Sequence, residues 1–369
     1  MDRLTRRQFL TRTAAGAAIW SAGCGGKPGG EFGGQQLRVF VYAGGHEKTM
    51  REVFVPRFQA ATGAAAVLDS GWWDAIPKLK ASPPDRPPYD LVITDATQGF
   101  PAARDGLFRR LDPARIPNHK NLTPAVLDHW IYRDGHGVPY PDSVMTLAYH
   151  KDAVAEAPSN WADLLRDDLR GKLGLYSSFY MSLYTFACMK AAAEGKPGTA
   201  AALVQKDLDG LLKFARANRE RVKFWWQTST DMTLGLVNRD CAAGNMHSPE
   251  MLQALRSQPK LGAVVPDADR AFVQVFWAIP AGTPRAELAE KAIDLIFSEE
   301  MQYEFAKRGS ATAVLPAARR MAAEDPLWAT LYPHTEEQFR SLRYYPYDAY
   351  FDHWDEIEKF WTREVLRNG

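Results

Sequence analysis

The chain alternates short apolar runs with amphipathic stretches. Apolar, β-rich runs at residues 37–42, 65–68 and 89–95 are separated by stretches whose apolar residues recur three or four positions apart. The runs predict strands. The three- or four-residue periodicity of the stretches between them predicts helices, the first of which ends at Gly63. A strand–helix–strand–helix–strand order is typical of a parallel sheet covered by helices.

A second set of runs repeats this pattern further along the chain. It predicts strands near residues 144–149, 172–176, 221–226 and 261–266. Residues 271–279 form another strongly β-type run that ends at Pro280, and we expect helices to begin at Pro284 and Glu299. In the aromatic tail, Trp354, Ile357, Phe360 and Trp361 stand at helical spacing. The pattern predicts two α/β units, a late return strand and a helical tail.

Polar and aromatic residues gather where the predicted strands end. Ligands of open α/β sheets bind beyond the carboxyl ends of the strands, so these residues are binding candidates. An exposed indole can stack on a ligand or hold a cation, and a carboxylate can pair with an amine. The candidate ligand-binding residues are Tyr42, His46, Trp72, Trp73, Asp74, Asp95, Tyr140, Asp142, Ser177, Ser178, Trp225, Trp226, Gln227, Thr230, His247, Ser248, Glu250 and Trp277.

Each candidate also has a structural alternative. The adjacent pairs Trp72-Trp73 and Trp225-Trp226 could lie wholly in the core, although we expect one ring of each pair to face the core and the other to face the ligand. The aspartates could cap helices or be solvated. Ser177-Ser178 precedes a predicted helix and so fits a cap, but a helix N-terminus also binds anions.

The first 24 residues are typical of an export signal, which we exclude from the fold. Thr-Arg-Arg-Gln-Phe-Leu at residues 5–10 precedes a small apolar stretch and resembles the twin-arginine signal. Ser-Ala-Gly-Cys at residues 21–24 resembles a lipobox, which makes Cys24 a lipidation site, and residues 25–36 a Gly-rich tether. A simple cleaved signal with an incidental cysteine is the alternative. We expect a periplasmic protein that is lipid-anchored to a membrane after twin-arginine export.

Composition and motifs exclude several other classes. The 369 residues carry a net charge of +1, so no basic excess points to nucleic acid. Three cysteines cannot make a disulfide scaffold or a four-thiolate zinc site, although Cys188 and Cys241 could be either thiols or a disulfide. The sequence has no phosphate-binding loop, dinucleotide fingerprint or nucleophile elbow, and His46-Glu47 is not followed by a second histidine at Met50. We therefore expect no cofactor, no metal and no catalytic residue.

Several short motifs follow one another in a characteristic order. They are Tyr-Asp-Leu-Val at 89–92, Gly-Leu at 106–107 with Leu-Asp at 111–112, Val-Pro-Tyr at 138–140, Leu-Ala-Tyr-His-Lys-Asp at 147–152, Trp-Ala-Asp-Leu at 161–164, Gly-Lys at 171–172 and Ile-Pro at 279–280. Together they resemble the extracellular solute-binding proteins of bacterial ABC importers, in the branch that includes polyamine, iron and thiamine binders.

The resemblance implies a two-lobed α/β fold, the type II periplasmic-binding fold. Each lobe would be a mixed, mostly parallel sheet flanked by helices. The implied parts are a signal peptide with lipobox at 1–24, the tether at 25–36, lobe 1 at 37–142 and 272–330, lobe 2 at 143–271, and a C-terminal helical extension at 331–369. The chain would cross between the lobes near 142–144 and return near 271–275.

The resemblance also implies a function without bond chemistry. The protein would be the substrate-binding component of an ABC import system, capturing a small polar organic solute, with or without an amine, by lobe closure. Its partners would be that solute and an ABC permease in the inner membrane. It would contact the membrane only through the lipid anchor, would not bind nucleic acid and would be a monomer. The alternatives are a periplasmic enzyme on this fold carrying a cofactor, marked by a reactive Cys241 beside His247, and a sensor or accessory lipoprotein with a degenerate site.

Two departures from the family pattern bear on the solute. Polyamine binders of this branch carry Trp-x-Asp shortly before the Ile-Pro of the return strand, whereas Val273, Gln274 and Val275 stand here. Iron binders use an adjacent tyrosine pair in the second lobe, but the only such pair here is Tyr344-Tyr345 in the tail. Both departures argue against these ligands and leave the solute open.

Overall fold

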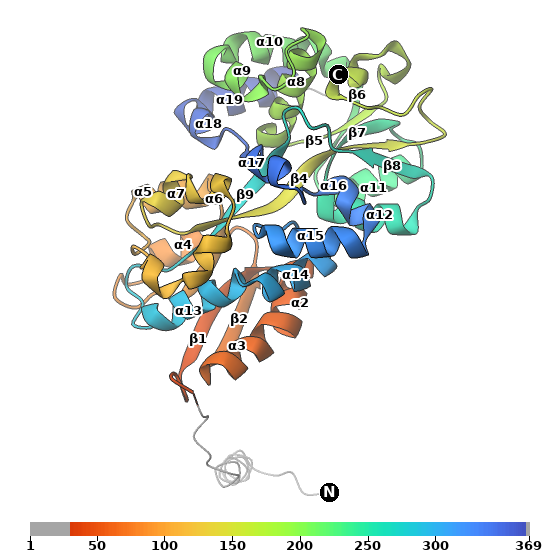
Figure 1. Cartoon of the computed structure of the whole chain (residues 1–369). Helices are drawn as coiled ribbons and strands as arrows, with labels where there is room; N and C mark the ends of the chain where they lie inside the picture. Colours follow the sequence, from red (N-terminus) through yellow and green to blue (C-terminus); the bar gives the residue numbers. More distant parts are fainter. Residues whose placement is uncertain (1–29, 367–369) are drawn as a thin grey trace, which may run out of the picture.

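The computed structural model describes residues 30–366, which form two α/β lobes joined by shared strands (Figure 1). Neighbouring strands follow the order β2 (Ala65–Gly71), β1 (Gln36–Tyr42), β3 (Leu91–Asp95), β9 (Ala271–Ala278), β4 (Val138–His150), β7 (Ala243–His247), β5 (Leu173–Tyr176) and β6 (Val222–Trp226). Off this path, β10 (Arg343–Tyr344) pairs with β9, and β8 (Leu261–Val264) pairs with β4. The predicted two-lobed fold of mixed sheets is confirmed.

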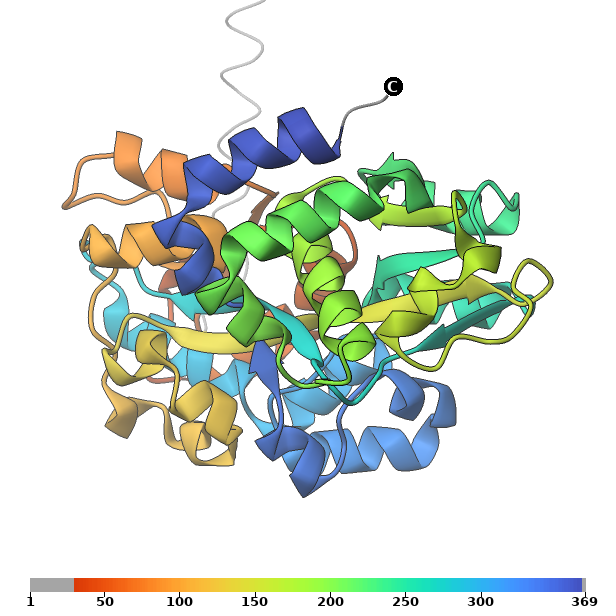
Figure 2. The same ribbon diagram turned by 90° about the horizontal axis from the view of Figure 1, so that it is seen from above.

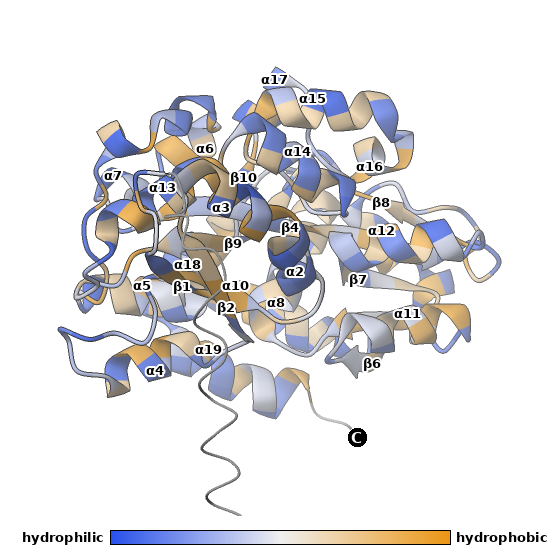
Figure 3. Ribbon diagram, turned by 90° about the horizontal axis from the view of Figure 1, so that it is seen from below, coloured by the Kyte–Doolittle hydropathy of each residue, from blue (hydrophilic) through white to orange (hydrophobic). Residues whose placement is uncertain are grey.

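Lobe 1 is built on β1, which pairs in parallel with both β2 and β3, while β9 runs antiparallel to β3. Val39, Phe40 and Val41 of β1 are fully buried, as expected for a strand covered on both faces. The helices of this lobe are α2 (Gly45–Thr49), α3 (Val55–Thr62), α4 (Ala75–Ala81), α5 (Ala96–Arg104), α6 (Pro124–Leu127), α7 (Trp130–Arg133), α13 (Ala286–Ile296), α14 (Glu299–Lys307) and α15 (Leu315–Glu324). Helix α16 (Pro326–Leu331), which follows α15, packs against β8 instead. Figure 3 shows the strands in mainly hydrophobic colours inside helices of mixed colour.

Lobe 2 repeats the plan around β5, which is parallel to β6 and β7, with β4 antiparallel to β7 and β8. Its helices are α8 (Phe179–Ala193), α9 (Ala200–Lys206), α10 (Leu208–Asn218), α11 (Ser229–Val237) and α12 (Ser248–Ser257). Helix α8 is apolar on nearly every side, because it is the central helix of the lobe. Cys188 in α8 and Cys241 are both buried and unpaired, so the two are thiols and not a disulfide.

Two strands carry the chain between the lobes. Strand β4 pairs with β9 over Val138–Val144 and with β7 over Met145–Tyr149, and its pairing with β9 shifts register between Pro141 and Val144. Such an irregularity breaks the ladder and lets a strand bend. The lobes therefore meet within one strand, at Asp142 and Ser143. The residue bounds assigned to the lobes above remain a prediction, because β4 pairs with strands of both lobes.

The C-terminal tail is helical, as expected from the spacing of its aromatic residues. It contains α17 (Glu336–Arg340), α18 (Tyr347–Asp352) and α19 (Trp354–Phe360), followed by a last turn, Trp361–Val365. Helix α17 packs against α6 of lobe 1, whereas α19 and the last turn run along the upper edge of the molecule in Figure 2. The Tyr350 hydroxyl donates to the Tyr180 carbonyl at 3.0 Å, and the indole nitrogen of Trp361 donates to the Ser177 carbonyl at 2.8 Å. The tail is thereby attached to the start of α8 in lobe 2.

Helix α13 begins at Ala286, two residues later than predicted, and the reason is the role of Thr283. We expected Thr283 to cap a helix that starts at Pro284. Its hydroxyl instead donates to the buried Asp90 carboxylate at 2.7 Å and accepts from the Arg285 amide at 3.1 Å. Asp90 thus ties the start of β3 to the segment before α13, and the helix can begin only after that contact.

Candidate functional site between the lobes

Seven side chains between the lobes lie deep in the protein and are nevertheless reached by solvent. Six of them are half-buried, and the seventh, Glu250, is exposed. We call this group the interlobe site: Tyr42, His46, Asp95, Asp142, Tyr180, His247 and Glu250. Its members come from the carboxyl ends of β1, β3 and β7, from the crossing strand β4, and from the first turns of α2, α8 and α12.

Lobe 1 contributes an aromatic wall to the interlobe site. Tyr42 ends β1, and the ring of Trp72 stacks on it with centroids 5.8 Å apart at an interplanar angle of 17°. The Tyr42 amide donates to Nδ1 of His46 at 3.2 Å, which leaves the proton of the neutral ring on Nε2. Burial lowers the pKa of His46 to about 4, so the ring is neutral at physiological pH. The Tyr42 hydroxyl has no hydrogen-bond partner among the described residues and is free to bind a ligand.

Lobe 2 contributes a second group of rings around Tyr176, the last residue of β5. Its ring lies 4.4 Å from Trp226 and 5.7 Å from each of Tyr180 and His247, measured between centroids. Asn245, which is fully buried, holds this group in place. Its side-chain oxygen accepts from the Tyr176 amide at 2.9 Å and from the Trp226 indole at 3.2 Å.

Three carboxylates, Asp95, Asp142 and Glu250, belong to the interlobe site. Asp95 caps α5 and accepts from the amides of Thr97 and Gln98, yet desolvation outweighs these bonds and raises its pKa. Desolvation also raises the pKa of Glu250. It raises the pKa of Asp142 to about 7, with the charge of Glu250 as the second cause. No lysine or arginine within residues 30–366 pairs with any of the three. The site is therefore acidic and lacks an internal counter-ion.

Two hydrogen bonds connect the crossing strand to the start of α12. The Val144 amide donates to the Ser248 hydroxyl at 2.9 Å, and the Ser143 hydroxyl lies 3.2 Å from Nδ1 of His247. Ser248 therefore has a structural contact, and the same contact joins the chain segments that carry Asp142 and Glu250. This arrangement joins the lobe-crossing point to the acidic centre of the site.

Several predicted residues lie outside the interlobe site. Asp74 pairs with Lys78 at 2.5 Å, Trp225 packs edge-on against Trp361 at 5.5 Å, and the Tyr140 hydroxyl donates to the Ala311 carbonyl. Trp277 is buried, and its ring contacts that of His46. Gln227 and Thr230 are exposed near the start of α11. Ser177 makes its hydrogen bonds through its backbone amide and carbonyl. Ser178 holds the N-cap position of α8 without a side-chain bond.

The expectation that each tryptophan pair has one ring in the core is wrong for Trp72-Trp73. Both rings are exposed, at 60% and 53%. They follow β2, which is an edge strand with little covering it, so the turn has no core to face. In the other pair Trp226 is buried and Trp225 half-buried.

Sequence reasoning missed three aromatic or polar neighbours of the site: Tyr176, Tyr180 and Ser143. Tyr176 ends a predicted strand and Tyr180 follows within one helical turn, so both satisfied the strand-end criterion. Tyr347 is a fourth: the charge of Asp95 contributes to its raised pKa, but it comes from the tail and offered no local signal.

One of the two features that would favour the enzyme alternative, besides a bound cofactor, was a reactive Cys241 beside His247, and the structure separates these two residues. They stand at opposite ends of β7, which at about 3.3 Å per residue places them roughly 15–20 Å apart. Burial raises the pKa of Cys241 to about 12, so it is not an activated thiol.

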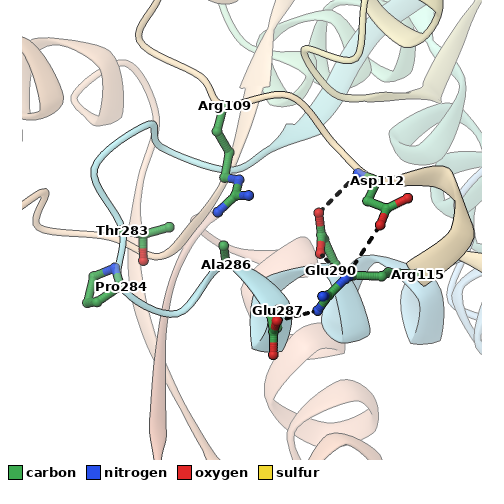
Figure 4. Close-up of a pocket in the computed structure, with 8 residues that line it drawn as sticks. All are labelled: Arg109, Asp112, Arg115, Thr283, Pro284, Ala286, Glu287 and Glu290. Carbon is green, nitrogen blue, oxygen red and sulfur yellow. Dashed lines mark hydrogen bonds and ion pairs between the residues drawn. The ribbon is translucent and has the colours of Figure 1, made fainter.

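A separate pocket of about 390 Å³ lies on lobe 1, between the Arg109–Arg115 segment and the start of α13 (Figure 4). Arg115 there pairs with Glu287 at 2.6 Å and lies 3.8 Å from Glu290. Because most of its charges are already paired and none comes from the interlobe site, we do not assign the solute to this pocket.

Two α/β lobes, joined by crossing strands and presenting unsatisfied polar and aromatic groups to each other, define a class of proteins that enclose a small molecule between lobes. Residues 54–333 match the model of the family described as bacterial extracellular solute-binding protein. The chain belongs to this family. The expected role as an extracellular solute-binding protein is confirmed at this level.

Individual relatives agree with the family assignment. The chain is 23% identical to the gamma-aminobutyric acid-binding protein of Pseudomonas aeruginosa over 337 residues, covering 88% of this chain and 89% of the relative. It is 23% identical to the spermidine/putrescine-binding periplasmic protein of Escherichia coli over 251 residues, covering 67% and 70%. The structure of a spermidine/putrescine ABC transporter substrate-binding protein from Streptococcus pneumoniae superposes with a TM-score of 0.70 at 18% identity, covering 89% and 99%. Among residues 30–366, no helix has the length and apolar character that crossing a membrane requires.

Proposed function

We propose that this protein captures a small organic amine between its lobes and delivers it to an ABC permease. The observation that carries the proposal is the set of Asp95, Asp142 and Glu250, three carboxylates with raised pKa values and without a basic partner in the described part of the chain; Asp95 and Asp142 are half-buried. An ionised carboxylate removed from water is unfavourable unless a cation or hydrogen bonds compensate it. A protonated amine supplies that compensation.

The aromatic walls suit the same kind of ligand. The faces of Tyr42 and Trp72 on lobe 1 and of Tyr180 on lobe 2 attract a cation, with about 0.5–2 kcal/mol per well-placed contact. No arginine or lysine is among the groups that influence Asp95, Asp142 or Glu250, so a ligand carboxylate would find no basic partner there. These contacts favour an amine without a carboxylate.

Polyamine binders of this branch carry an aspartate in the return strand that is absent from β9 here, but this absence does not contradict the proposal. Gln274 occupies that part of β9, but it is buried and lies within 3.1 Å of the His129 ring. The acids of the interlobe site come from other elements, namely β3, β4 and α12. The names of the two curated relatives, for gamma-aminobutyric acid and for spermidine and putrescine, share an amine, which supports the same class of solute.

Closure of the lobes follows from where the acids stand. Asp95 belongs to lobe 1, Glu250 to lobe 2, and Asp142 to the strand that joins them. An amine held by acids from both lobes makes more contacts when the lobes are closed, so its binding shifts the population toward the closed form.

Calorimetric titration with putrescine, spermidine, gamma-aminobutyric acid and an uncharged sugar tests the proposal. We expect binding of at least one of the two polyamines, weaker binding of gamma-aminobutyric acid and none of the sugar. Asp95→Asn should weaken binding at least tenfold. Asp85→Asn, a change of an exposed loop carboxylate, is the matched control and should bind as the wild type does. Failure of every amine to bind would refute the proposal.

We further propose that the protein is exported by the twin-arginine route, lipidated at Cys24 and monomeric, with no catalytic activity. The signal and Cys24 lie outside the described residues, so this proposal is supported by the sequence motifs and by the family. Cys24→Ala should move the protein from the membrane fraction to the soluble periplasmic fraction. Replacing Arg6 and Arg7 by lysine should retain it inside the cell, and export of that variant would refute the twin-arginine route.

A further inference from the structure

Helix α18 of the C-terminal tail contacts one helix of each lobe, and both of these helices begin at the interlobe site (Figure 1). Helix α5 of lobe 1 is capped by Asp95, and helix α8 of lobe 2 carries Tyr180 in its first turn. Both residues are members of the interlobe site. A contact that fixes α5 relative to α8 therefore also fixes these two residues relative to each other.

On the side of lobe 1, helix α18 is held by an ion pair and by two aromatic rings. Oδ1 of Asp348 lies 3.0 Å from Nη2 of Arg104, the last residue of α5. The rings of Tyr347 and Phe351 lie 6.1 Å and 6.0 Å from the ring of Phe100, which is buried in the middle of α5. Both side chains of the ion pair are more than half exposed, so the pair can be changed without disturbing the core.

On the side of lobe 2, the same helix is held by buried groups. Tyr350 is fully buried, and its hydroxyl donates to the Tyr180 carbonyl at 3.0 Å. Phe179, the first residue of α8, packs edge-on against Tyr350 at 5.8 Å and against Trp354, the first residue of α19, at 4.6 Å. Helix α18 is therefore fastened firmly to lobe 2, whereas its attachment to lobe 1 includes an exposed ion pair.

The strands that join the lobes do not by themselves fix the angle between them. The pairing of β4 with β9 shifts register between Pro141 and Val144, and such an irregularity lets a strand bend. A rotation of one lobe about this point changes the distance between α5 and α8. Because α18 touches both helices, the rotation has to break its contacts on one side, and the exposed ion pair to lobe 1 is the weaker side.

We propose that helix α18 is a clasp that holds the lobes in the arrangement in which their halves of the interlobe site face each other, with Asp348 and Arg104 as positioning residues for solute binding. The inference rests on the proposed function. These two residues act through α5 and α8 and do not touch the solute. When the clasp is broken, the lobes spend part of the time apart, and the affinity falls in proportion to the fraction of molecules that can bind.

Reversal of the two charges tests the clasp in a calorimetric titration with putrescine. Asp348→Arg and Arg104→Glu each place like charges on α18 and α5, and each should weaken binding about two- to tenfold. The double variant restores opposite charges and should bind within about twofold of the wild type. Asp209→Arg is the matched control, because it reverses one charge of an exposed pair with Lys213 inside a single helix of lobe 2, and it should bind as the wild type does.

Two outcomes of this titration would overturn the inference. One is an unchanged affinity in both single variants. The other is a double variant that binds as weakly as the single ones, because a paired interaction is restored by the exchange of charges and a purely structural defect is not.

A measurement on the empty protein keeps the clasp testable if no amine binds. Spin labels at Ala60→Cys on α3 of lobe 1 and Ser257→Cys on α12 of lobe 2, both exposed positions, report the spread of distances between the lobes. The distribution should broaden in Asp348→Arg, return to that of the wild type in the charge-exchanged variant, and stay unchanged in Asp209→Arg. An unchanged distribution in Asp348→Arg would overturn the inference whatever the solute proves to be. A broadened distribution without binding of any amine would refute only the proposed function.

Discussion

Asp142→Asn is expected to stabilise the empty protein at pH 8 and to change its stability little at pH 4. Asparagine is close in shape to the protonated aspartic acid and cannot ionise. The substitution therefore removes only the cost of the charge. This makes it a direct measure of how strongly the interlobe site disfavours a carboxylate in the absence of a solute.

The magnitude follows from the pKa. Burial and the neighbouring Glu250 raise it from 3.8 to about 7, and a tenfold change in an ionisation equilibrium corresponds to about 1.4 kcal/mol. The ionised form is thus disfavoured by about 4 kcal/mol in the folded protein. Since solvent reaches Asp142 and the site can relax, we expect about 2–4 kcal/mol to be measured.

The direction with pH follows from the same values. Because the folded-state pKa is the higher one, the favourable contribution of the protonated group is fully present below pH 3.8 and is lost as the pH rises through about 7. Above that pH the loss is complete. The difference in unfolding free energy between variant and wild type should therefore grow from near zero at pH 4 to its full value at pH 8.

Urea unfolding at pH 4, 6 and 8 measures this difference, with unchanged m-values showing that the two states expose the same surface. Asp85→Asn provides the control, since its exposed carboxylate should give the same stability as the wild type at every pH. The reasoning is refuted if Asp142→Asn destabilises the protein equally at all three pH values. That result would mean that the Asp142 carboxylate makes favourable contacts in the folded state.

Four further substitutions probe the site and the sheet. Trp72→Ala should reduce solute affinity roughly 2- to 30-fold with little change in unfolding free energy, because its exposed ring stacks on Tyr42, whereas Trp73→Ala should have a smaller effect on the same titration. Asn245→Ala should lower the unfolding free energy by about 3 kcal/mol or more, because it leaves the Tyr176 amide and the Trp226 indole N–H without a partner. Urea unfolding measures this loss, and an unchanged midpoint would contradict the prediction. Gly244→Ala should prevent normal folding, seen as loss of soluble protein or of its circular dichroism, because a Cβ there would lie 1.7 Å from a backbone oxygen of β5.

Individual residues show how far the sequence predicted the candidate site. Asp95 could be placed at a strand end from the pattern alone; the structure gives it the role of helix cap, and its contact with a ligand stays a prediction. Trp72 and Trp73 were assigned opposite environments, but both are exposed because β2 proved to be an edge strand. Tyr347 could not be predicted at all, since its position depends on the path of the tail.

The order of strands and helices, the end of the first helix at Gly63 and the amphipathic tail are local properties, and hydrophobic spacing determines them without reference to the rest of the chain. Which acids gather without a counter-ion is a different kind of property. Asp142 and Glu250 are more than 100 positions apart, and their chain segments meet because β4 crosses between the lobes and is bonded to the start of α12. Electrostatic interactions and desolvation depend on distance and on surrounding atoms, so only the tertiary structure could decide the acidity of the site and the chemistry of the solute it suits.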